Sequence, residues 1–513
     1  MLILFALLVV ALTALYLHST RHHKYWVEKG VKHDKPIPFF GTNAKNYLLR
    51  KSLTEMAVEA YRKYPKEKVV GMHMASWPVL VLRDPDIIKQ VLITDFVYFY
   101  GRGLNTHEEV IEPLLRNLFF ADGDLWRLLR QRMTPAFTSG KLRAMFPLII
   151  ERAEKLQSRT ASAASEGRTI DARDLMARYT TDFIGACGFG LDADSLNEEN
   201  SAFRKLGKNI FKIGLAESVT VYLKDLCPAL FKYAKLLGSV EGELIDLVKF
   251  ILKERNYQPS GRNDFIDLLL ECKSKGLLTG DSIEKTKPDG TPEETSVVLD
   301  DVLMAAQVFV FFAAGFETSS SATSFTLHQL AFNPDVQKKV QDNIDRVLAK
   351  HNNKLSYEAV KEMTYLDWTF KEGMRMFPSL GFLIRKCAKK YTFPNMDLTI
   401  DPGVRVFIPL QALHMDPLYF DNPEEFRPER FDPEVFDSKL KNIYMPFGIG
   451  PRACIGERLG HMQSLAGLAA VLSKFSVRPA PETVRYPRVD PPSGVVQSIL
   501  GGIPLLFEER KSS

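Results

Sequence analysis

The sequence predicts a mainly α-helical fold with a smaller β region. Helical periodicity extends over residues 147–163 and 455–475. The run 302–316 contains Gln307 as its only polar residue. Short runs at 79–82 and 404–408 have the composition of strands. A helix that is apolar on almost every side belongs in a protein centre. We therefore expect residues 302–316 to form the core of a helix-rich fold.

Length and composition indicate one large folded unit. The chain has 513 residues, of which 45% are hydrophobic and 25% charged, and this is enough for a sizeable buried core. Length alone allows about three domains, but no repeat, low-complexity tract or long linker separates them. We expect one unit over residues 42–513. Within it, the polar segment Lys273–Thr295 is predicted to be an exposed loop.

Charge and cysteine content exclude several classes of protein. The formal charge of +5 is mild, and no dense basic block interleaved with aromatic residues is present, so no nucleic-acid partner is expected. A membrane surface and an acidic protein partner fit this charge equally well. An odd number of cysteines without a CxxC pair argues against both a disulfide framework and a zinc site. The five are Cys187, Cys227, Cys272, Cys387 and Cys454, and they indicate a reducing, cytosol-facing environment.

The N-terminus carries a targeting signal. Residues 2–17 are almost wholly apolar, near the ~17-residue lower limit for crossing a bilayer, and basic residues follow at 21–24. A cleaved secretory peptide is the alternative, but its basic residues usually precede the apolar run. Downstream charges keep the following domain in the cytosol. We expect an uncleaved membrane anchor over residues 1–20 and a basic, proline-containing hinge over 21–41.

Residues 447–456 carry the most informative motif, Phe-Gly-Ile-Gly-Pro-Arg-Ala-Cys-Ile-Gly. Its glycines permit a tight turn that exposes the sulfur of Cys454, and Gly456 lets a flat macrocycle approach the backbone. A helix beginning at Ile455 would stabilise a Cys454 thiolate through its dipole. Five positions match the haem-binding pattern of cytochromes P450, and a chance match is on the order of 10⁻⁴. A buried structural cysteine in a Gly-rich turn is the alternative.

The chain thus resembles the cytochromes P450, which are haem-thiolate monooxygenases, over essentially its whole length. The resemblance implies the cytochrome P450 fold and a haem b cofactor with Cys454 as the axial ligand of the iron, a ligand type that favours O–O cleavage. It further implies that the haem contacts Phe447, Gly456, Trp126, Arg130, Arg385 and Arg452. The four last-named residues would bind the propionates. Trp126 and Arg130 share one helix face at i, i+4, for which a plain amphipathic helix is an equal alternative.

An ExxR pair precedes this motif. Glu372 and Arg375 stand three apart and would share one helix face. A lone pair of this kind is more often a weak surface ion pair. Here the run Pro428–Phe431 lies shortly before the cysteine loop, and the resemblance implies that Arg430 joins Glu372 and Arg375 in a buried triad with a structural role.

The predicted central helix continues into the run Ala314-Gly315-Phe316-Glu317-Thr318. Gly315 could mark the end of a helix, although helix-compatible residues follow at 320–330. The resemblance implies that Ala314 and Gly315 open a groove for dioxygen. It also implies that Thr318 and Glu317 hydrogen-bond the dioxygen and relay protons to it.

Within the family, the run 134–141 is most similar to arthropod microsomal enzymes that clear foreign compounds such as plant toxins or insecticides. Apolar and aromatic residues dominate the segments where the resemblance implies contact with a lipophilic small-molecule substrate, which are 104–120, the region near Phe211, 309–312, 379–384 and 495–500. No dinucleotide fingerprint is visible, so electrons would come from a separate NADPH–cytochrome P450 reductase, with cytochrome b5 as an additional partner. The expected location is the endoplasmic reticulum membrane.

Three alternatives remain open at this point. A monooxygenase of an endogenous lipid or hormone precursor would carry the same motifs. A reductase-independent haem enzyme could rearrange peroxides, and a non-catalytic haem protein could sense or carry a ligand. The Glu317–Thr318 pair favours the monooxygenase.

Overall fold

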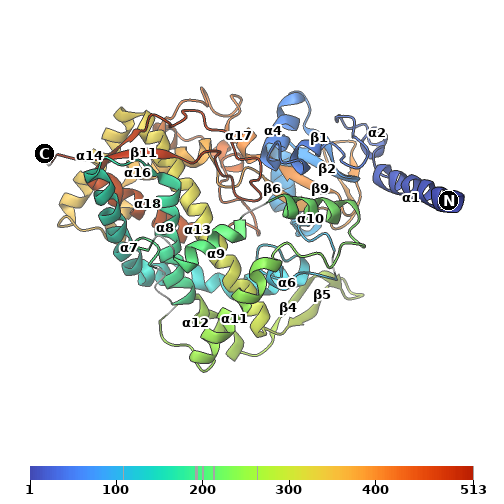
Figure 1. Cartoon of the computed structure of the whole chain (residues 1–513), viewed down its shortest axis with the longest axis horizontal. Helices are drawn as coiled ribbons and strands as arrows, with labels where there is room; N and C mark the ends of the chain where they lie inside the picture. Colours follow the sequence, from blue (N-terminus) through green and yellow to red (C-terminus); the bar gives the residue numbers. More distant parts are fainter. Residues whose placement is uncertain (108, 191–193, 199–200, 212–213, 263, 512–513) are drawn as a thin grey trace.

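The computed structural model describes residues 1–107, 109–190, 194–198, 201–211, 214–262 and 264–511. Helices occupy most of this part of the chain, and strands form a smaller portion, with the largest sheet at the side where the N-terminal helix lies (Figure 1). The prediction of a mainly α fold with a smaller β region is confirmed.

The helices are α1 (Leu2–Thr20), α2 (Tyr25–Glu28), α3 (Ala44–Tyr47), α4 (Leu53–Lys63), α5 (Pro85–Lys89), α6 (Gly123–Met133), α7 (Ser139–Ser165), α8 (Ala172–Ile184), α9 (Ala202–Phe211), α10 (Leu215–Leu226), α11 (Gly238–Glu254), α12 (Phe265–Ser274), α13 (Asp301–Phe332), α14 (Pro334–Lys350), α15 (Tyr357–Glu362), α16 (Thr364–Met376), α17 (Leu410–His414) and α18 (Glu457–Lys474). The strands are β1 (Val69–Met74), β2 (Trp77–Leu82), β3 (Ile170–Asp171), β4 (Leu278–Thr286), β5 (Pro292–Val297), β6 (Leu383–Lys386), β7 (Tyr391–Thr392), β8 (Thr399–Ile400), β9 (Arg405–Ile408), β10 (Phe475–Pro479) and β11 (Pro504–Glu509).

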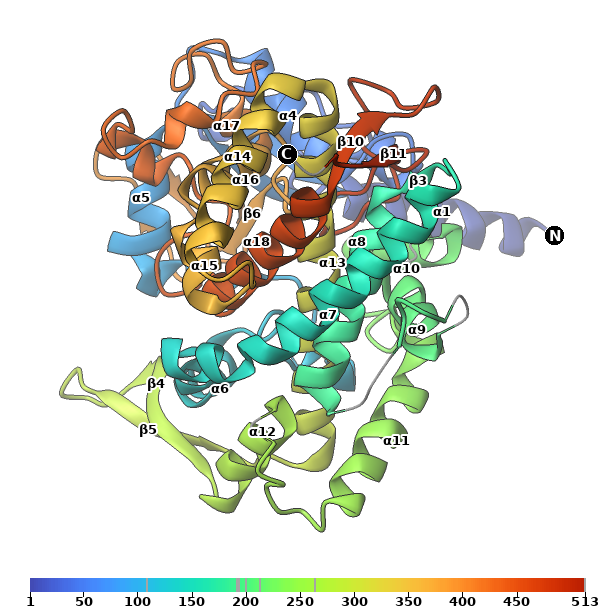
Figure 2. The same ribbon diagram turned by 90° about the vertical axis from the view of Figure 1, so that its left-hand side faces the viewer.

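Helix α13 is the centre of the fold. Its N-terminus is capped by Asp300, whose carboxylate accepts a hydrogen bond of 2.7 Å from the Leu303 amide. Most of its side chains are buried, and it packs against α8, α11, α16 and α18 (Figure 2). The apolar run predicted to lie in the core is therefore confirmed, and the helix extends well beyond it because Gly315 continues the helix.

The largest sheet has the strand order β1–β2–β9–β6. Strands β2 and β9 are parallel, with Val79 opposite Arg405, and the other neighbours are antiparallel. The two runs predicted as strands lie in β2 and β9. A second sheet, β10–β11–β3, pairs the C-terminal part of the chain with the two residues that precede α8.

The expectation of an exposed loop over residues 273–295 is wrong. Strands β4 and β5 form an antiparallel hairpin there, which lies against α6 (Figure 2). Leu278 and Ser282 face the protein and are buried, whereas most of the other side chains are exposed. The strands were not predicted because their composition is polar. Only one narrow face of the hairpin packs against the protein, so few apolar residues are needed. Gly290, at φ +84°, supplies the left-handed residue of the turn.

Helix α1 projects away from the body of the protein (Figure 1). Most of its apolar side chains are exposed, and the segment Leu2–Glu28 is long and apolar enough to cross a membrane. Its end contacts the globular part, since the His18 ring and the carbonyl of Leu226 at the end of α10 lie 2.9 Å apart. Helix α13 also has sufficient length and apolarity, but most of it is buried inside the protein.

Candidate functional site

The loop that carries Cys454 is held by backbone hydrogen bonds. The Cys454 amide donates to the carbonyl of Phe447 at 2.8 Å, and the Ala453 amide donates to Gly450 at 3.0 Å. Gly450 has φ +76°, and a Cβ atom there would lie 2.1 Å from the carbonyl oxygen of Leu92. Only glycine fits this position. Beside Gly456, a Cβ atom would approach no closer than 3.9 Å to the Phe137 ring, so space remains on that side of the loop.

Cys454 is exposed as a residue, although protein atoms closely surround its thiol. Helix α18 begins at Glu457, three residues later, and not at Ile455 as expected. Burial raises the pKa of the Cys454 thiol, while the Gly456 amide and the guanidinium groups of Arg130 and Arg102 act in the opposite direction. The helix start therefore does not produce a thiolate by itself. Coordination to a metal ion would do so, because a coordinating thiol is deprotonated outright.

Arginine side chains gather around this loop. The guanidinium of Arg452 stacks on the Trp126 ring, 4.1 Å from its centroid, and donates to the carbonyls of Tyr100 and Ala121 at 2.8 and 2.9 Å. Arg130 donates to the carbonyl of Ala453 at 2.8 Å. The structure thus brings Trp126, Arg130 and Arg452 to the cysteine loop.

Arg385 and Arg452 are almost fully buried, and each has one nitrogen without a hydrogen-bond partner, Nε of Arg385 and Nη1 of Arg452. Burial lowers the pKa of Arg385 to about 9, and burial together with neighbouring Arg102 lowers the pKa of Arg452. Asp122 is the carboxylate that faces them, 3.0 Å from Arg452. Buried cations in such excess, with unused donors, are complementary to a ligand that carries carboxylates. The haem propionates fit this requirement.

Arg102 belongs to the same cluster and was missed by the sequence reasoning. Its guanidinium lies over the Phe119 ring and donates to the carbonyls of Phe119 and Arg452 at 2.7 and 3.3 Å. Burial lowers its pKa to about 10, and Asp122 opposes this shift. No local motif marks Arg102. Its position is set by Asp122, twenty residues later, which accepts a hydrogen bond of 2.6 Å from its backbone amide.

On α13, Ala314 is exposed in the middle of a buried helix, whereas Gly315 is not open. A Cβ atom at Gly315 would lie 2.4 Å from Cδ1 of Ile184 in α8, so this glycine allows the two helices to approach closely. The Cβ side of Gly315 is therefore occupied by α8 and the exposed position is Ala314, while the groove for dioxygen at this pair stays a prediction. The Thr318 hydroxyl donates to the Ala314 carbonyl at 2.7 Å, and Glu317 forms an ion pair with Arg173 of α8.

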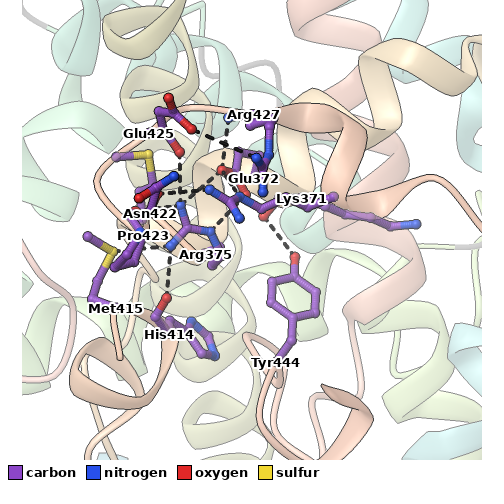
Figure 3. A network of polar contacts seen from close by, with 12 residues as sticks. Lys371, Glu372, Arg375, His414, Met415, Asn422, Pro423, Glu425, Arg427 and Tyr444 are labelled. Atoms are coloured by element: carbon purple, nitrogen blue, oxygen red, sulfur yellow. Dashed lines mark hydrogen bonds and ion pairs between the residues drawn. The ribbon is translucent and has the colours of Figure 1, made fainter. Parts of the chain in front are cut away.

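Glu372 and Arg375 of α16 are fully buried and lie at the centre of a network of polar contacts (Figure 3). Nε and Nη2 of Arg375 donate to the two carboxylate oxygens of Glu372 at 2.8 and 2.9 Å, and Nε of Arg430 donates to Glu372 Oε1 at 3.2 Å. Arg375 also donates to the backbone carbonyl of His414 at 2.8 Å. The three side chains expected to form a triad are thus in contact. They connect α16 to the segment that precedes the cysteine loop.

The segments expected to contact substrate fall in different environments. Phe309–Phe312 are buried in α13, and Leu500 is exposed. Residue 108 and the side chain of Phe211 lie outside the described part of the chain. The Phe447 ring lies edge-on to His461 of α18, with the centroids 6.4 Å apart.

Comparison with known proteins agrees with this architecture. The family model described as cytochrome P450 matches residues 32–504. The chain is 36% identical to cytochrome P450 6B6 of Helicoverpa armigera over 509 residues, which cover 99% of this chain and 98% of the relative. It is 35% identical to cytochrome P450 6a2 of Drosophila melanogaster over 512 residues, with 98% of each chain covered, and 35% identical to cytochrome P450 6B1 of Papilio polyxenes, with 96% of each covered. The predicted family and fold are confirmed, and the chain belongs to the cytochrome P450 family of haem-iron monooxygenases.

Proposed function

We propose that this chain oxygenates lipophilic foreign compounds, such as plant toxins or insecticides, with electrons from NADPH. One oxygen atom of O2 enters the substrate and the other leaves as water, so the reaction consumes two electrons and two protons. A separate NADPH–cytochrome P450 reductase would supply the electrons, with cytochrome b5 as an additional donor. Similarity to three insect enzymes supports this proposal.

The observation that carries the proposal is the cationic cluster beside Cys454. Haem b would be held there by the Cys454 sulfur on iron and by Trp126, Arg130, Arg385 and Arg452 at the propionates, with Arg102 as a fifth contact. Phe447 and Gly456 would border the macrocycle. The haem supplies dioxygen binding and activation.

The polar residues of α13 would deliver protons. Glu317 and Thr318 are neighbours that directly follow the apolar run of α13, and both are only partly buried. The buried triad of Glu372, Arg375 and Arg430 would fix the backbone before the cysteine loop without touching the reacting atoms. Its role is structural.

The proposal places the chain in the endoplasmic reticulum membrane. Residues 1–20 form the anchor, residues 21–41 the hinge and residues 42–513 the catalytic domain facing the cytosol. The exposed apolar surface of α1 and the basic residues after it support this arrangement.

The test uses the full chain in membranes together with the reductase. Incorporation of labelled oxygen from ¹⁸O2 into a panel of plant toxins, insecticides, fatty acids and steroids is measured, with and without NADPH. We expect NADPH-dependent incorporation into foreign compounds. Incorporation only into fatty acids or steroids would assign an endogenous substrate, and peroxide rearrangement without reductant would assign the isomerase alternative.

The axial ligand is tested separately by the carbon monoxide difference spectrum of the reduced protein. The wild-type chain should show the strongly red-shifted Soret band of a thiolate adduct, and Cys454→Ala should lose it. Cys227→Ser is the matched control, because this residue is also partly exposed but lies at the end of α10. Loss of the band in the Cys227 variant alone would contradict the assignment.

A further inference from the structure

Arg173, at the start of α8, joins two segments that the proposed function uses separately. One terminal nitrogen, Nη2, forms the ion pair with Glu317 of α13. The other, Nη1, donates a 3.0 Å hydrogen bond to the backbone carbonyl of Gln497. Gln497 lies in the segment 495–500, which is expected to contact substrate. A single guanidinium therefore bridges the acid and this segment.

Further hydrogen bonds connect this bridge to the backbone of Thr318. The Gln497 amide donates to the carbonyl of Ser379 at 2.8 Å, and the Ser379 hydroxyl donates to the carbonyl of Thr318 at 2.8 Å. Ser321 of α13 also donates to the Gln497 carbonyl, at 3.3 Å. These hydrogen bonds link the 495–500 segment to the backbone of Thr318 and to Arg173. A shift of the segment would therefore move the hydrogen-bond partners of Thr318 and of Arg173.

The surroundings make this geometry stiff. The side chains of Arg173 and Glu317 are each 13% exposed, so the ion pair is screened less than a surface pair. Gly315 packs closely against Ile184 of α8. This contact between the two helices lies less than one turn of α13 from Glu317. One terminal nitrogen of Arg173 holds the Glu317 carboxylate and the other is held by the Gln497 carbonyl, so the guanidinium itself has little freedom.

We propose that Arg173 is a positioning residue that orients the Glu317 carboxylate and couples this orientation to the 495–500 segment. The proposal rests on the proposed function, in which Glu317 relays protons. A lipophilic substrate that presses on 495–500 would move the Gln497 carbonyl, and the shared guanidinium would transmit the movement to the acid. Arg173 does not touch substrate or dioxygen itself.

The consequence concerns the fate of dioxygen. When protons arrive at the right oxygen, the O–O bond breaks, water leaves and the other oxygen atom enters the substrate. When the acid is misplaced, O2 takes up the two electrons from the reductase and two protons and leaves as hydrogen peroxide. Arg173 should therefore determine how the electrons of NADPH are divided between oxygenated product and hydrogen peroxide.

The experiment compares Arg173→Gln, Arg173→Lys and Glu317→Gln in the full chain with the reductase. The ratio of hydrogen peroxide to oxygenated product should rise roughly tenfold in Arg173→Gln and in Glu317→Gln, and no further in the double variant. Arg173→Lys keeps a cation beside Glu317 and should stay close to wild type. The matched control is Arg178→Gln, a buried arginine of the same helix whose carboxylate partner, Asp174, is also on α8.

A second measurement does not depend on turnover. Hydrogen–deuterium exchange of peptides covering 495–500 should be roughly tenfold faster in both Arg173 variants, because neither can hold Glu317 and the Gln497 carbonyl together. Arg178→Gln should leave exchange there unchanged. A merely structural role would raise exchange throughout α8 in the Arg178 and Arg173 variants alike.

The outcomes separate the two proposals. An unchanged peroxide ratio in Arg173→Gln, with a raised ratio in Glu317→Gln, overturns the inference and leaves the proposed function intact. An unchanged ratio in both refutes proton relay by Glu317 and the inference with it. Absence of any oxygenated product from the wild-type chain contradicts the proposed function, and exchange at 495–500 still decides whether Arg173 holds this segment.

Discussion

Replacing Glu372 by glutamine tests the buried network of Figure 3. The Glu372 carboxylate accepts two hydrogen bonds from Arg375 and one from Arg430, and its Oε1 also accepts one from the Arg427 amide at 3.0 Å. Both Glu372 and Arg375 have no exposed side-chain surface. The glutamine amide keeps the shape of the side chain, but it removes the negative charge and points an NH2 group at arginine donors.

The expected loss follows from leaving the buried guanidinium of Arg375 without its counter-charge, whereas Arg430 keeps its ion pair with Asp421. Removing one partner of a buried ion pair costs about 3–5 kcal/mol. The amide oxygen still accepts one or two of the hydrogen bonds, so we expect Glu372→Gln to lower the free energy of unfolding by about 3 kcal/mol, near the lower end of that range. This corresponds to roughly a hundredfold change in the unfolding equilibrium constant.

The assay is urea unfolding of the full chain in detergent, followed by circular dichroism. Asp342→Asn is the control, because its ion pair with Lys338 joins two well-exposed side chains of α14 and contributes about 0.5 kcal/mol or less. A loss below about 1 kcal/mol in Glu372→Gln, comparable with the control, would show that the buried charges do not need this carboxylate.

Three further variants test the geometry of the loop, the buried histidine and the cationic cluster. Gly450→Ala should abolish the carbon monoxide band, since its Cβ would meet a carbonyl oxygen, whereas Gly290→Ala, with open space, should cost only about 1 kcal/mol in urea unfolding. Burial lowers the pKa of His414 to about 3 from the ordinary 6.5, so its neutral form stabilises the fold above pH 6.5 and this stability is lost as the pH falls from 6.5 toward 3. The drop in the free energy of unfolding from pH 7 to pH 5 should therefore be about 2 kcal/mol smaller in His414→Gln than in the wild-type chain. An equal drop in the two proteins would show that burial of His414 does not cause this pH dependence. Arg452→Leu should bind haem roughly tenfold more weakly in transfer to an acceptor protein, and unchanged transfer would argue against a propionate contact.

Residues that local patterns mark were found from the sequence. The apolar run around Gln307 has to be buried somewhere, and the turn before Cys454 requires its glycines whatever surrounds it. The i, i+3 spacing likewise fixes that Glu372 and Arg375 share a helix face. In each case the physical cause lies within about one helical turn of the residue, so the sequence contains it.

Residues whose role depends on distant partners were not found. Arg102 joins the site through Asp122, and Arg173 reaches Glu317 from another helix, 144 positions away in the chain. Neither arginine differs in its sequence neighbourhood from those that form surface pairs. The helix start expected at Ile455 is also wrong, since the helix begins only at Glu457, after Gly456.

The hairpin of β4 and β5, found where an exposed loop was expected over residues 273–295, also supports the site. It holds α6, the helix that carries Trp126 and Arg130. Ser282 of β4 donates to the Asp124 carboxylate at 2.8 and 2.9 Å, and the Ile283 amide donates to it at 2.7 Å. Two residues earlier, Asp122 binds Arg452 on the side of the cysteine loop. The first turn of α6 is therefore fixed from both sides, by the hairpin and by the loop. Ser282 and Ile283 lie in the irregular part of the hairpin between Asp281 and Thr286, and the paired residues on either side hold this part in place against Asp124.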